Sequence, residues 1–349
     1  MNIYLPPSLK ERPFPNRRGA IWKSPFLVCL FVVALSVQAE PPVFKGVTVS
    51  CQTWGREWQT PEMAQTLDEL KSLGANSFAI HPYAQIAEDG HVRFRTIDGN
   101  RHITVPLEWA RERGLSVMMI PHIAYWGTKF LWRGEINFAT PTEWDNFFND
   151  YETWIVEMAK LAEAHGAAVF CVGLEFAFAE KYPERWLKII AAVRAVYRGK
   201  LTYGGNWNAF ETVKFWGALD YIGVLAYFPL TKTPNPSREE IAAAWEERCA
   251  QLERFSKQNG GKQFIFVELG YNESAKAAAE PWSFKTGGEY ATEIQARCMD
   301  VALALPEKHS FLAGMFLWKW FPEIPSDEQE NFRLQTPAIK AVMAKHWLK

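Results

Sequence analysis

The chain has 349 residues, 48% of them hydrophobic, and a formal net charge of −1. A nearly neutral chain with no basic block and no arginine-rich face excludes nucleic acid as its expected partner. The cysteines are widely scattered and no two of them have the spacing of metal ligands, so neither a metal ion nor a cofactor is predicted.

Segment 1–39 has the layout of a secretory signal peptide. Its first residues are polar and basic, Pro25 to Val37 is almost entirely apolar, and Val37-Gln38-Ala39 is a small-x-small cleavage site. The apolar part is too short for a confident membrane span, and the alternatives are an uncleaved anchor or a start assigned too far upstream. The sequence therefore predicts export, either secreted or periplasmic, with no membrane attachment after cleavage.

Removing 39 of the 349 residues leaves 310, which can bury one large core, so residues 40–349 are expected to form one domain and to act as a monomer. This part contains Cys51, Cys171, Cys249 and Cys298. Cys51 and Cys171 lie on apolar strands, where a small buried hydrophobe is the simplest interpretation. Whether any pair is oxidised after export stays open.

Apolar strand candidates alternate with helix-period segments from Phe44 onward, the pattern of βα units around a parallel sheet. Eight strands are predicted: Phe44–Val49, Ser77–Ile80, Ser116–Ile120, Val169–Gly173, Leu201–Gly204, Tyr221–Ala226, Phe264–Val267 and Phe311–Leu317. Helix starts are marked by Thr60-Pro61, Thr140-Pro141, Ser237 and Thr336-Pro337. Eight units in 310 residues predict an α/β fold, a single (β/α)8 TIM barrel.

Two glutamates follow buried strands of this predicted barrel. Glu175 comes just after Val169–Gly173, and Glu268 comes at the end of Phe264–Val267. One such glutamate could be a structural ion-pair partner, but two at the fourth and seventh strand ends favour catalysis. A pair of carboxylates is the minimum for hydrolysing a glycosidic bond, with one as acid and the other as nucleophile or base.

Polar and aromatic residues at other strand ends are candidate substrate ligands. His122 is either a hydrogen-bonding ligand or a structural histidine, and Tyr227 either holds a carboxylate ionised or packs in the core. Asn206 and Trp207 are interpreted as a hydroxyl ligand beside a stacking platform, in preference to a turn residue beside a core tryptophan.

Tryptophans gather at the strand ends and in the loops beyond them. Trp318 and Trp320 alternate with period two, so both are expected on one face as the floor of a sugar site, with Lys319 on the other face. The alternative is two core tryptophans that close the barrel. Trp132 lies in a long loop, where the wall of a substrate cleft is favoured over a surface patch. Trp282 lies in another loop beyond the strand ends and is a further candidate for binding a sugar ring.

The chain resembles glycoside hydrolase family 113, a group of retaining β-mannanases, from Gly46 to Trp347. The resemblance is carried by these segments: Pro121-His122, Trp132-Arg133-Gly134, Val172-Gly173-Leu174-Glu175, Leu201 to Trp207, Leu219 to Gly223, Ala226 to Leu230, Glu268-Leu269-Gly270-Tyr271, Pro281-Trp282 and Phe316 to Trp320. It implies Glu175 as acid/base, Glu268 as nucleophile and an endo-acting β-1,4-mannan hydrolase that works by double displacement.

Two departures from the family pattern bear on the carboxylates. Leu174 stands where the family usually has Thr, and Val267 stands where the nucleophile is usually preceded by Thr. The loss of both hydroxyls should dry the site and raise a carboxyl pKa. We expect Glu175 to be the protonated acid, Glu268 to be ionised with help from Tyr227, and the carboxyl groups to lie about 5–5.5 Å apart.

Other interpretations remain open at this stage. The same mechanism could act on another β-glycan, such as a glucan or a glucomannan, because recognition of mannose depends on positions to within about an ångström. A barrel that binds polysaccharide without cleaving it is the alternative from another class, against which the presence of both glutamates argues. Endo or exo action depends on loops such as Gly127–Ala139 and Ser274–Gly288.

Overall fold

The computed structural model describes residues 43–323 and 332–348. The predicted signal peptide lies outside the described residues. Within them, no helix is both long and apolar enough to span a bilayer.

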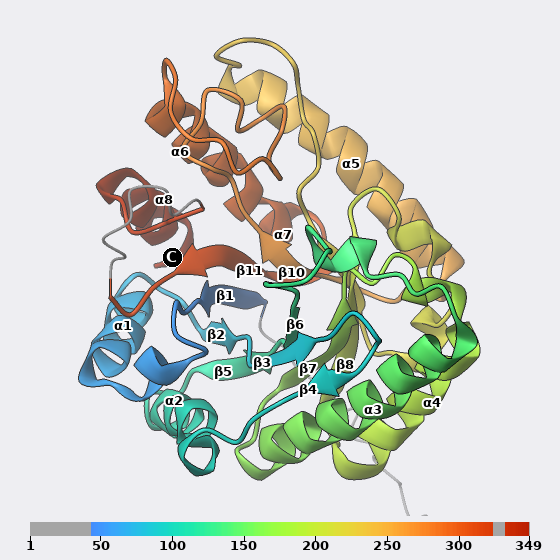
Figure 1. Ribbon diagram of the computed structural model, residues 1–349. Helices are drawn as coiled ribbons and strands as arrows, with labels where there is room; N and C mark the ends of the chain where they lie inside the picture. The colour runs from blue at the N-terminus through green and yellow to red at the C-terminus, as the bar shows by residue number, and fades with distance from the viewer. Residues whose placement is uncertain (1–42, 324–331, 349) are drawn as a thin grey trace, which may run out of the picture. The chain divides into compact units, whose positions relative to one another are not determined.

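Eight parallel strands close into a barrel in the order β1-β11-β10-β9-β8-β7-β5-β2. Their bounds are β1 Phe44–Val49, β2 Ser77–Ile80, β5 Ser116–Met119, β7 Val169–Leu174, β8 Lys200–Asn206, β9 Ile222–Leu225, β10 Phe264–Leu269 and β11 Leu312–Trp320. These are the eight predicted strands, with ends that differ by up to three residues. The predicted (β/α)8 barrel is confirmed, and Figure 1 shows the helices outside the ring of strands.

The outer helices are α1 Pro61–Ser72, α2 Arg101–Glu112, α3 Pro141–Ala164, α4 Pro183–Val196, α5 Arg238–Gln258, α6 Ala291–Leu303, α7 Leu305–Lys308 and α8 Pro337–Trp347. Short 3-10 turns are η1 Arg56–Gln59, η2 Asp98–Asn100, η3 Arg133–Glu135, η4 Ala179–Lys181, η5 Phe210–Thr212 and η6 Trp216–Ala218. Thr140 and Ser237 each make the predicted capping box. Thr336 caps α8 by accepting from the Ile339 amide, whereas Thr60 makes no side-chain cap.

A small second sheet, which the sequence did not predict, lies beyond the ends of two barrel strands. Its strands are β3 Tyr83–Ile86, β4 Val92–Arg93 and β6 His122–Ala124, in the order β4-β3-β6. β3 and β6 begin only a few residues after β2 and β5 end, and Tyr83 pairs with His122 across the two strands. This pairing joins the loops after the second and third barrel strands.

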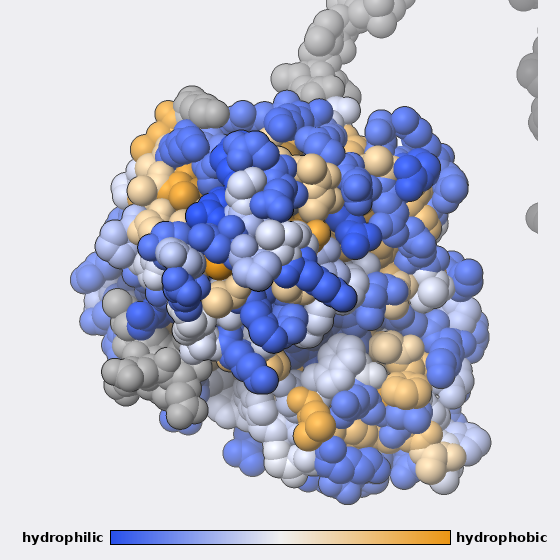
Figure 2. Space-filling model, turned by 90° about the horizontal axis from the view of Figure 1, so that it is seen from above, coloured by the Kyte–Doolittle hydropathy of each residue, from blue (hydrophilic) through white to orange (hydrophobic). Residues whose placement is uncertain are grey.

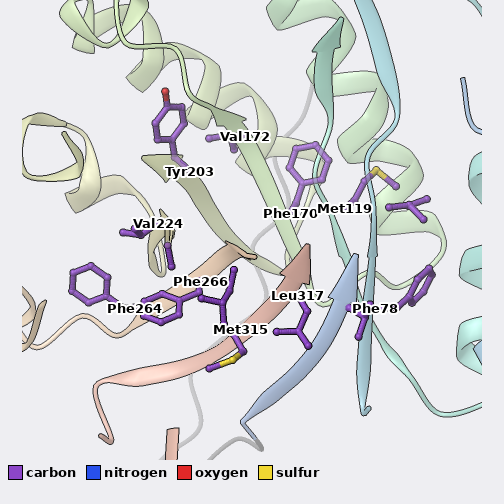
Figure 3. Close-up of a cluster of buried hydrophobic side chains, with 14 of the residues drawn as sticks. Phe78, Met119, Phe170, Val172, Tyr203, Val224, Phe264, Phe266, Met315 and Leu317 are labelled. Carbon is purple, nitrogen blue, oxygen red and sulfur yellow. The ribbon is translucent and has the colours of Figure 1, made fainter. Parts of the chain in front are cut away.

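Alternation along the strands divides the core into two layers. Side chains such as Phe170, Phe266 and Met315 pack between the sheet and the helices, as Figure 3 shows. Their neighbours, such as Cys171 and Ile265, fill the barrel interior. Parallel strands covered on both faces bury both sets, which explains their continuous apolar sequences. All four cysteines among the described residues are free thiols.

Three strands carry an extra residue near the rim of the barrel. Against their neighbours, β7 gains one residue between Cys171 and Leu174, β10 gains one between Phe266 and Glu268, and β11 gains one between Trp318 and Trp320. A β-bulge changes which face the following side chains occupy. The bulges therefore decide where the strand-end residues point.

Candidate active site

Glu268 is enclosed at the end of β10. The bulge in β10 pairs Glu268 with Leu225, whose side chain packs inside the barrel. Glu268 itself is only 3% exposed. Burial raises the pKa of the Glu268 carboxyl to about 8, and the nearby charge of Glu175 acts in the same direction. Arg133, the Tyr227 hydrogen bond and Lys319 act against this rise.

One Glu268 oxygen is hydrogen-bonded and the other is not. The Tyr227 hydroxyl donates to Oε2 at 2.7 Å, while His122 Nε2 lies 3.7 Å from Oε1. Neither Oε1 nor His122 Nε2 has a hydrogen-bond partner among the described residues. Buried polar atoms are nearly always paired in proteins, so this pair of atoms suits a hydroxyl brought by a ligand.

Glu175 faces a cation. Its Oε2 accepts from Arg133 Nε at 3.0 Å and lies 2.7 Å from Arg133 Nη2. Its backbone has φ 61°, a left-handed conformation that is uncommon for a residue with a side chain. Strained residues of this kind gather at functional sites, where the surroundings hold them in place.

The dry environment expected around Glu175 is found at Glu268 instead. Leu174 packs inside the barrel and Phe176 packs in the outer layer, so the two sequence neighbours turn away from the Glu175 carboxylate. The Glu175 side chain is 17% exposed and paired with Arg133, whereas the Glu268 side chain is 4% exposed. Where a strand ends in a sharp turn, the residues before and after a side chain do not predict what surrounds it.

A buried tyrosine clamps the turn that carries Glu175. The Glu175 amide donates to the Gly204 carbonyl at 2.9 Å, and the next amide, of Phe176, donates to the Tyr203 hydroxyl at 3.0 Å. Tyr203 in turn donates to Glu180 Oε1 at 2.8 Å. Burial raises the pKa of Glu180, although the Tyr203 hydrogen bond opposes this. These contacts, made by residues of β8 and η4, stabilise the left-handed backbone conformation of Glu175.

Arg133 is a functional residue that the sequence analysis missed. It begins η3 in the loop after β6, where the Trp132 ring folds so closely over Gly134 that a Cβ there would lie 2.0 Å from the ring. Trp132 itself is 37% exposed. The Trp132-Arg133-Gly134 segment was one of those that carry the family resemblance and could have indicated this residue. Its position in a loop does not show which of the three side chains turns toward the carboxylates.

His81 is a second missed residue. It lies just past β2, stacks on His122 with ring centroids 4.8 Å apart, and packs against Trp318 at 5.3 Å. Trp318 also stacks on His122. Burial lowers the pKa of His81 to about 3 and lowers that of His122 well below its usual range. Both rings are therefore neutral at neutral pH, and His122 is the one that lies near Glu268.

Trp207 and Trp282 form a stacked pair from the loops after β8 and β10. Their ring centroids are 5.2 Å apart at an interplanar angle of 18°, with Trp207 half-buried and Trp282 43% exposed. Asn206, the last residue of β8, is half-buried next to Trp207. The structure thus brings together two loop residues that lie far apart in the sequence.

Trp320 is not on the face of Trp318, and the expected two-tryptophan floor is wrong. Trp318 packs against the barrel interior, whereas Trp320 is fully buried in the outer layer with the Lys340 ammonium over its ring. The bulge in β11 is the reason, because the extra residue between them breaks the period-two alternation.

A (β/α)8 barrel that displays two interacting glutamates at its fourth and seventh strand ends has the form of a glycoside hydrolase. The family model of Glycoside Hydrolase Family 113 (GH113) matches residues 47–334, and the chain belongs to that family. Family membership makes it a glycoside hydrolase with a carbohydrate substrate. No match was found among curated proteins.

Solved structures share this fold. A GH113 β-mannanase from Alicyclobacillus acidocaldarius in complex with ManMIm has a TM-score of 0.76 and 24% identity, over 88% of this chain and 98% of that one. A GH113 β-1,4-mannanase complex has a TM-score of 0.77 and 24% identity, over 88% and 100%. A β-glucuronidase from Ruminococcus gnavus has a TM-score of 0.57 and 15% identity, over 88% of this chain and 50% of that one.

Proposed function

We propose that this protein is a retaining β-mannanase that cleaves β-1,4-mannosidic bonds in β-mannan or manno-oligosaccharides, with Glu268 as nucleophile and Glu175 as acid/base. The observation that carries the proposal is the geometry at the ends of the fourth and seventh barrel strands, where Arg133 is bonded to Glu175 and Tyr227 is bonded to Glu268. Retention requires the two carboxyls to lie about 5–5.5 Å apart, since inverting enzymes separate them further to admit a water.

Burial sets the protonation state of Glu268 in the free enzyme. The buried Glu268, whose pKa is about 8, retains its proton near neutral pH, and Glu175 is hydrogen-bonded to Arg133. Attack requires an ionised Glu268 and a proton on Glu175. Substrate binding therefore has to loosen the contact between Arg133 and Glu175 and bring the proton to Glu175, while the Tyr227 hydroxyl stabilises the ionised Glu268.

Two displacements then follow. A Glu268 oxygen bonds to the anomeric carbon while the glycosidic C–O bond breaks, and Glu175 gives its proton to the leaving oxygen. Glu175, now a carboxylate, takes a proton from water, the water oxygen bonds to the anomeric carbon, and the bond to Glu268 breaks. Inversion occurs twice, so the anomeric configuration is retained.

The substrate is proposed from the family and from the solved GH113 mannanases, which are 24% identical to this chain. Proposed ligands around the reacting sugar are His122, Tyr227 and Trp318, with Asn206, Trp207, Trp282 and Trp132 further out. Glu268 Oε1 and His122 Nε2, which have no hydrogen-bond partner in the described part of the chain, suit a substrate hydroxyl. Trp320 is omitted because it is fully buried.

We also propose that the protein is exported after cleavage near Ala39 and acts as a monomer. Amino-terminal sequencing of the protein recovered outside the cytoplasm tests the cleavage site. Sedimentation of the processed protein tests the monomer.

Product analysis tests the reaction and its substrate. The processed protein is incubated with β-mannan, glucomannan, β-glucan and xylan, with the matched variant Glu268→Gln as control. We expect manno-oligosaccharides from β-mannan, and NMR should show the β-anomer before mutarotation. Preferential cleavage of another glycan would show that this glycan, and not β-mannan, is the substrate. Release of the α-anomer would contradict the retaining mechanism. Cleavage of none of the four glycans would contradict catalysis on β-glycans.

A further inference from the structure

Three aromatic residues outside the set considered so far gather at the rim of the barrel. Trp54 follows β1, Tyr83 begins β3 and Trp126 follows β6, and we call them the outer aromatic cluster. Ring centroids lie 5.7 Å apart for Trp54 and Trp126, 5.1 Å for Tyr83 and Trp126, and 5.8 Å for Trp54 and Tyr83. Trp54 is 39% exposed and Trp126 is 49% exposed.

The loop after β1 holds Trp54 in a fixed, strained conformation. Trp54 has φ 62° and Gly55 has φ 91°, two left-handed residues in succession. The Glu57 carboxylate accepts from the backbone amides of Gln52 and Thr53 and from the Thr53 hydroxyl. Such a conformation persists only where the surroundings enforce it, and it is typical of binding sites.

Trp126 is also held in place before any ligand arrives. The Thr128 hydroxyl and amide both donate to the Tyr125 carbonyl, at 2.6 and 3.2 Å, which closes the turn that carries Trp126. The Gln85 side chain donates to the Trp126 carbonyl at 3.4 Å and so ties the turn to β3. Preorganised rings lose little conformational freedom on binding, which favours affinity.

Ring contacts connect the cluster to the carboxylates. Tyr83 lies edge-on to His122 at 5.9 Å, and His122 Nε2 is 3.7 Å from Glu268 Oε1. The cluster comes from the loops after the first three barrel strands, whereas the stacked pair Trp207 and Trp282 comes from the loops after β8 and β10. A chain that crosses Glu175 and Glu268 therefore has an aromatic platform on each side.

The size of the exposed surface favours a sugar over a protein as occupant. A tryptophan buries about 150–250 Å² at most, so two exposed ones provide far less than the roughly 800 Å² per partner of a stable protein interface. One face of the molecule is mostly hydrophilic, with small separate hydrophobic patches (Figure 2). The flat apolar face of a pyranose matches an indole ring, and its hydroxyls remain in water.

We propose that Trp54, Tyr83 and Trp126 bind a sugar unit of the substrate chain away from the bond that is cleaved, so that the enzyme favours long chains over short ones. This inference rests on the proposed function for the identity of the chain, but it concerns residues that take no part in bond cleavage.

The test measures kcat/KM on β-1,4-manno-oligosaccharides of increasing length and on an aryl β-mannoside. Trp126→Ala and Trp54→Ala should each lose about tenfold or more on the longest substrates, mainly through KM, with little change on the aryl mannoside. Trp126→Phe should retain most of the preference. The control Leu187→Ala, which removes an exposed apolar side chain from α4, should match wild type. An equal loss at every length, or no loss at any length, would overturn the inference.

A second measurement separates this inference from the proposed function. If wild type cleaves none of the glycans, the proposed function fails, and migration through gels containing β-mannan, glucomannan, β-glucan or xylan then decides about the cluster. Weaker retardation of Trp126→Ala than of wild type in one of these gels supports the binding site. Equal migration of wild type, Trp126→Ala and Leu187→Ala in every gel overturns it.

Discussion

Glu268 and Glu175 leave the same rim of the barrel, but their surroundings are opposite. Glu268 is 3% exposed, bonded to the Tyr227 hydroxyl and close to the neutral His122 ring. Glu175 has a left-handed backbone and is paired with Arg133. Burial without a direct ion pair raises the pKa of Glu268 and favours its protonated form. Two identical side chains thus acquire different burial and different partners from their positions in one fold.

The strongest test of this comparison is removal of the enclosed carboxylate. Glu268→Ala should lower turnover by at least about 10⁴-fold on every substrate, because it removes the proposed nucleophile that forms the glycosyl-enzyme. Activity on β-mannan and on an aryl mannoside is the measurement, with the exposed Glu253→Ala as control. Substantial activity left on either substrate would show that Glu268 is not the nucleophile.

Glu175→Ala should depend on the leaving group. We expect about a 10³-fold loss on polysaccharide and a much smaller loss on an aryl glycoside, since a good leaving group departs without a proton. Azide should accelerate breakdown of the glycosyl-enzyme of this variant. Equal losses on both substrates, with no rescue of Glu175→Ala or Glu268→Ala by azide, would show that the two roles are assigned wrongly.

The raised pKa of Glu268 also makes a prediction about stability. With a pKa of about 8 when folded, against an ordinary value of about 4.5, its stabilising contribution is full below about pH 4.5 and is lost as the pH rises through 8. Glu268→Gln cannot ionise, so its stability relative to wild type should rise over this window, by on the order of a few kcal/mol. Denaturant unfolding at pH 5 and 8.5 measures it. A constant difference would contradict burial as the cause.

Tyr227→Phe removes the hydrogen bond that favours the ionised Glu268. Because this bond lowers the pKa of Glu268, its loss should raise that pKa and move the acidic limb of the kcat/KM profile to higher pH. A hydrogen bond to a charged group contributes about 1.5–3 kcal/mol, which corresponds to roughly 10- to 100-fold in rate near neutral pH. An unchanged acidic limb would mean that Tyr227 acts only in packing.

The smallest expected effect concerns the turn at Glu175. Tyr203→Phe removes the acceptor for the Phe176 amide and should lower activity on polysaccharide by about tenfold, while the aryl glycoside is less affected. Tyr197→Phe is the matched control, because Tyr197 is equally buried and donates to the Ala167 carbonyl away from the site. If both variants lose the same activity on both substrates, Tyr203 has only a structural role.

The architecture could be predicted from local sequence signals. The eight apolar strands, the capping boxes at Thr140 and Ser237, and the glutamates after two strands all depend on residues that are close in sequence. Burial of a strand on both faces and capping of a helix are local requirements. The barrel and its two candidate carboxylates therefore followed from the chain alone.

The directions and surroundings of the side chains depended on tertiary structure. Bulges in β10 and β11 arise from pairing with neighbouring strands, and they turn Glu268 inward and separate Trp318 from Trp320. Period-two alternation contains no information about such an insertion.

The partners of the two carboxylates come from distant segments. Arg133 reaches Glu175 from 42 positions away, and Tyr227 reaches Glu268 from 41. The sequence determined which residues stand at the rim of the barrel, because strand burial and helix capping are local. Only the fold decided which carboxylate is enclosed and which meets a cation, because burial and charge are set by groups that the chain brings together over long distances.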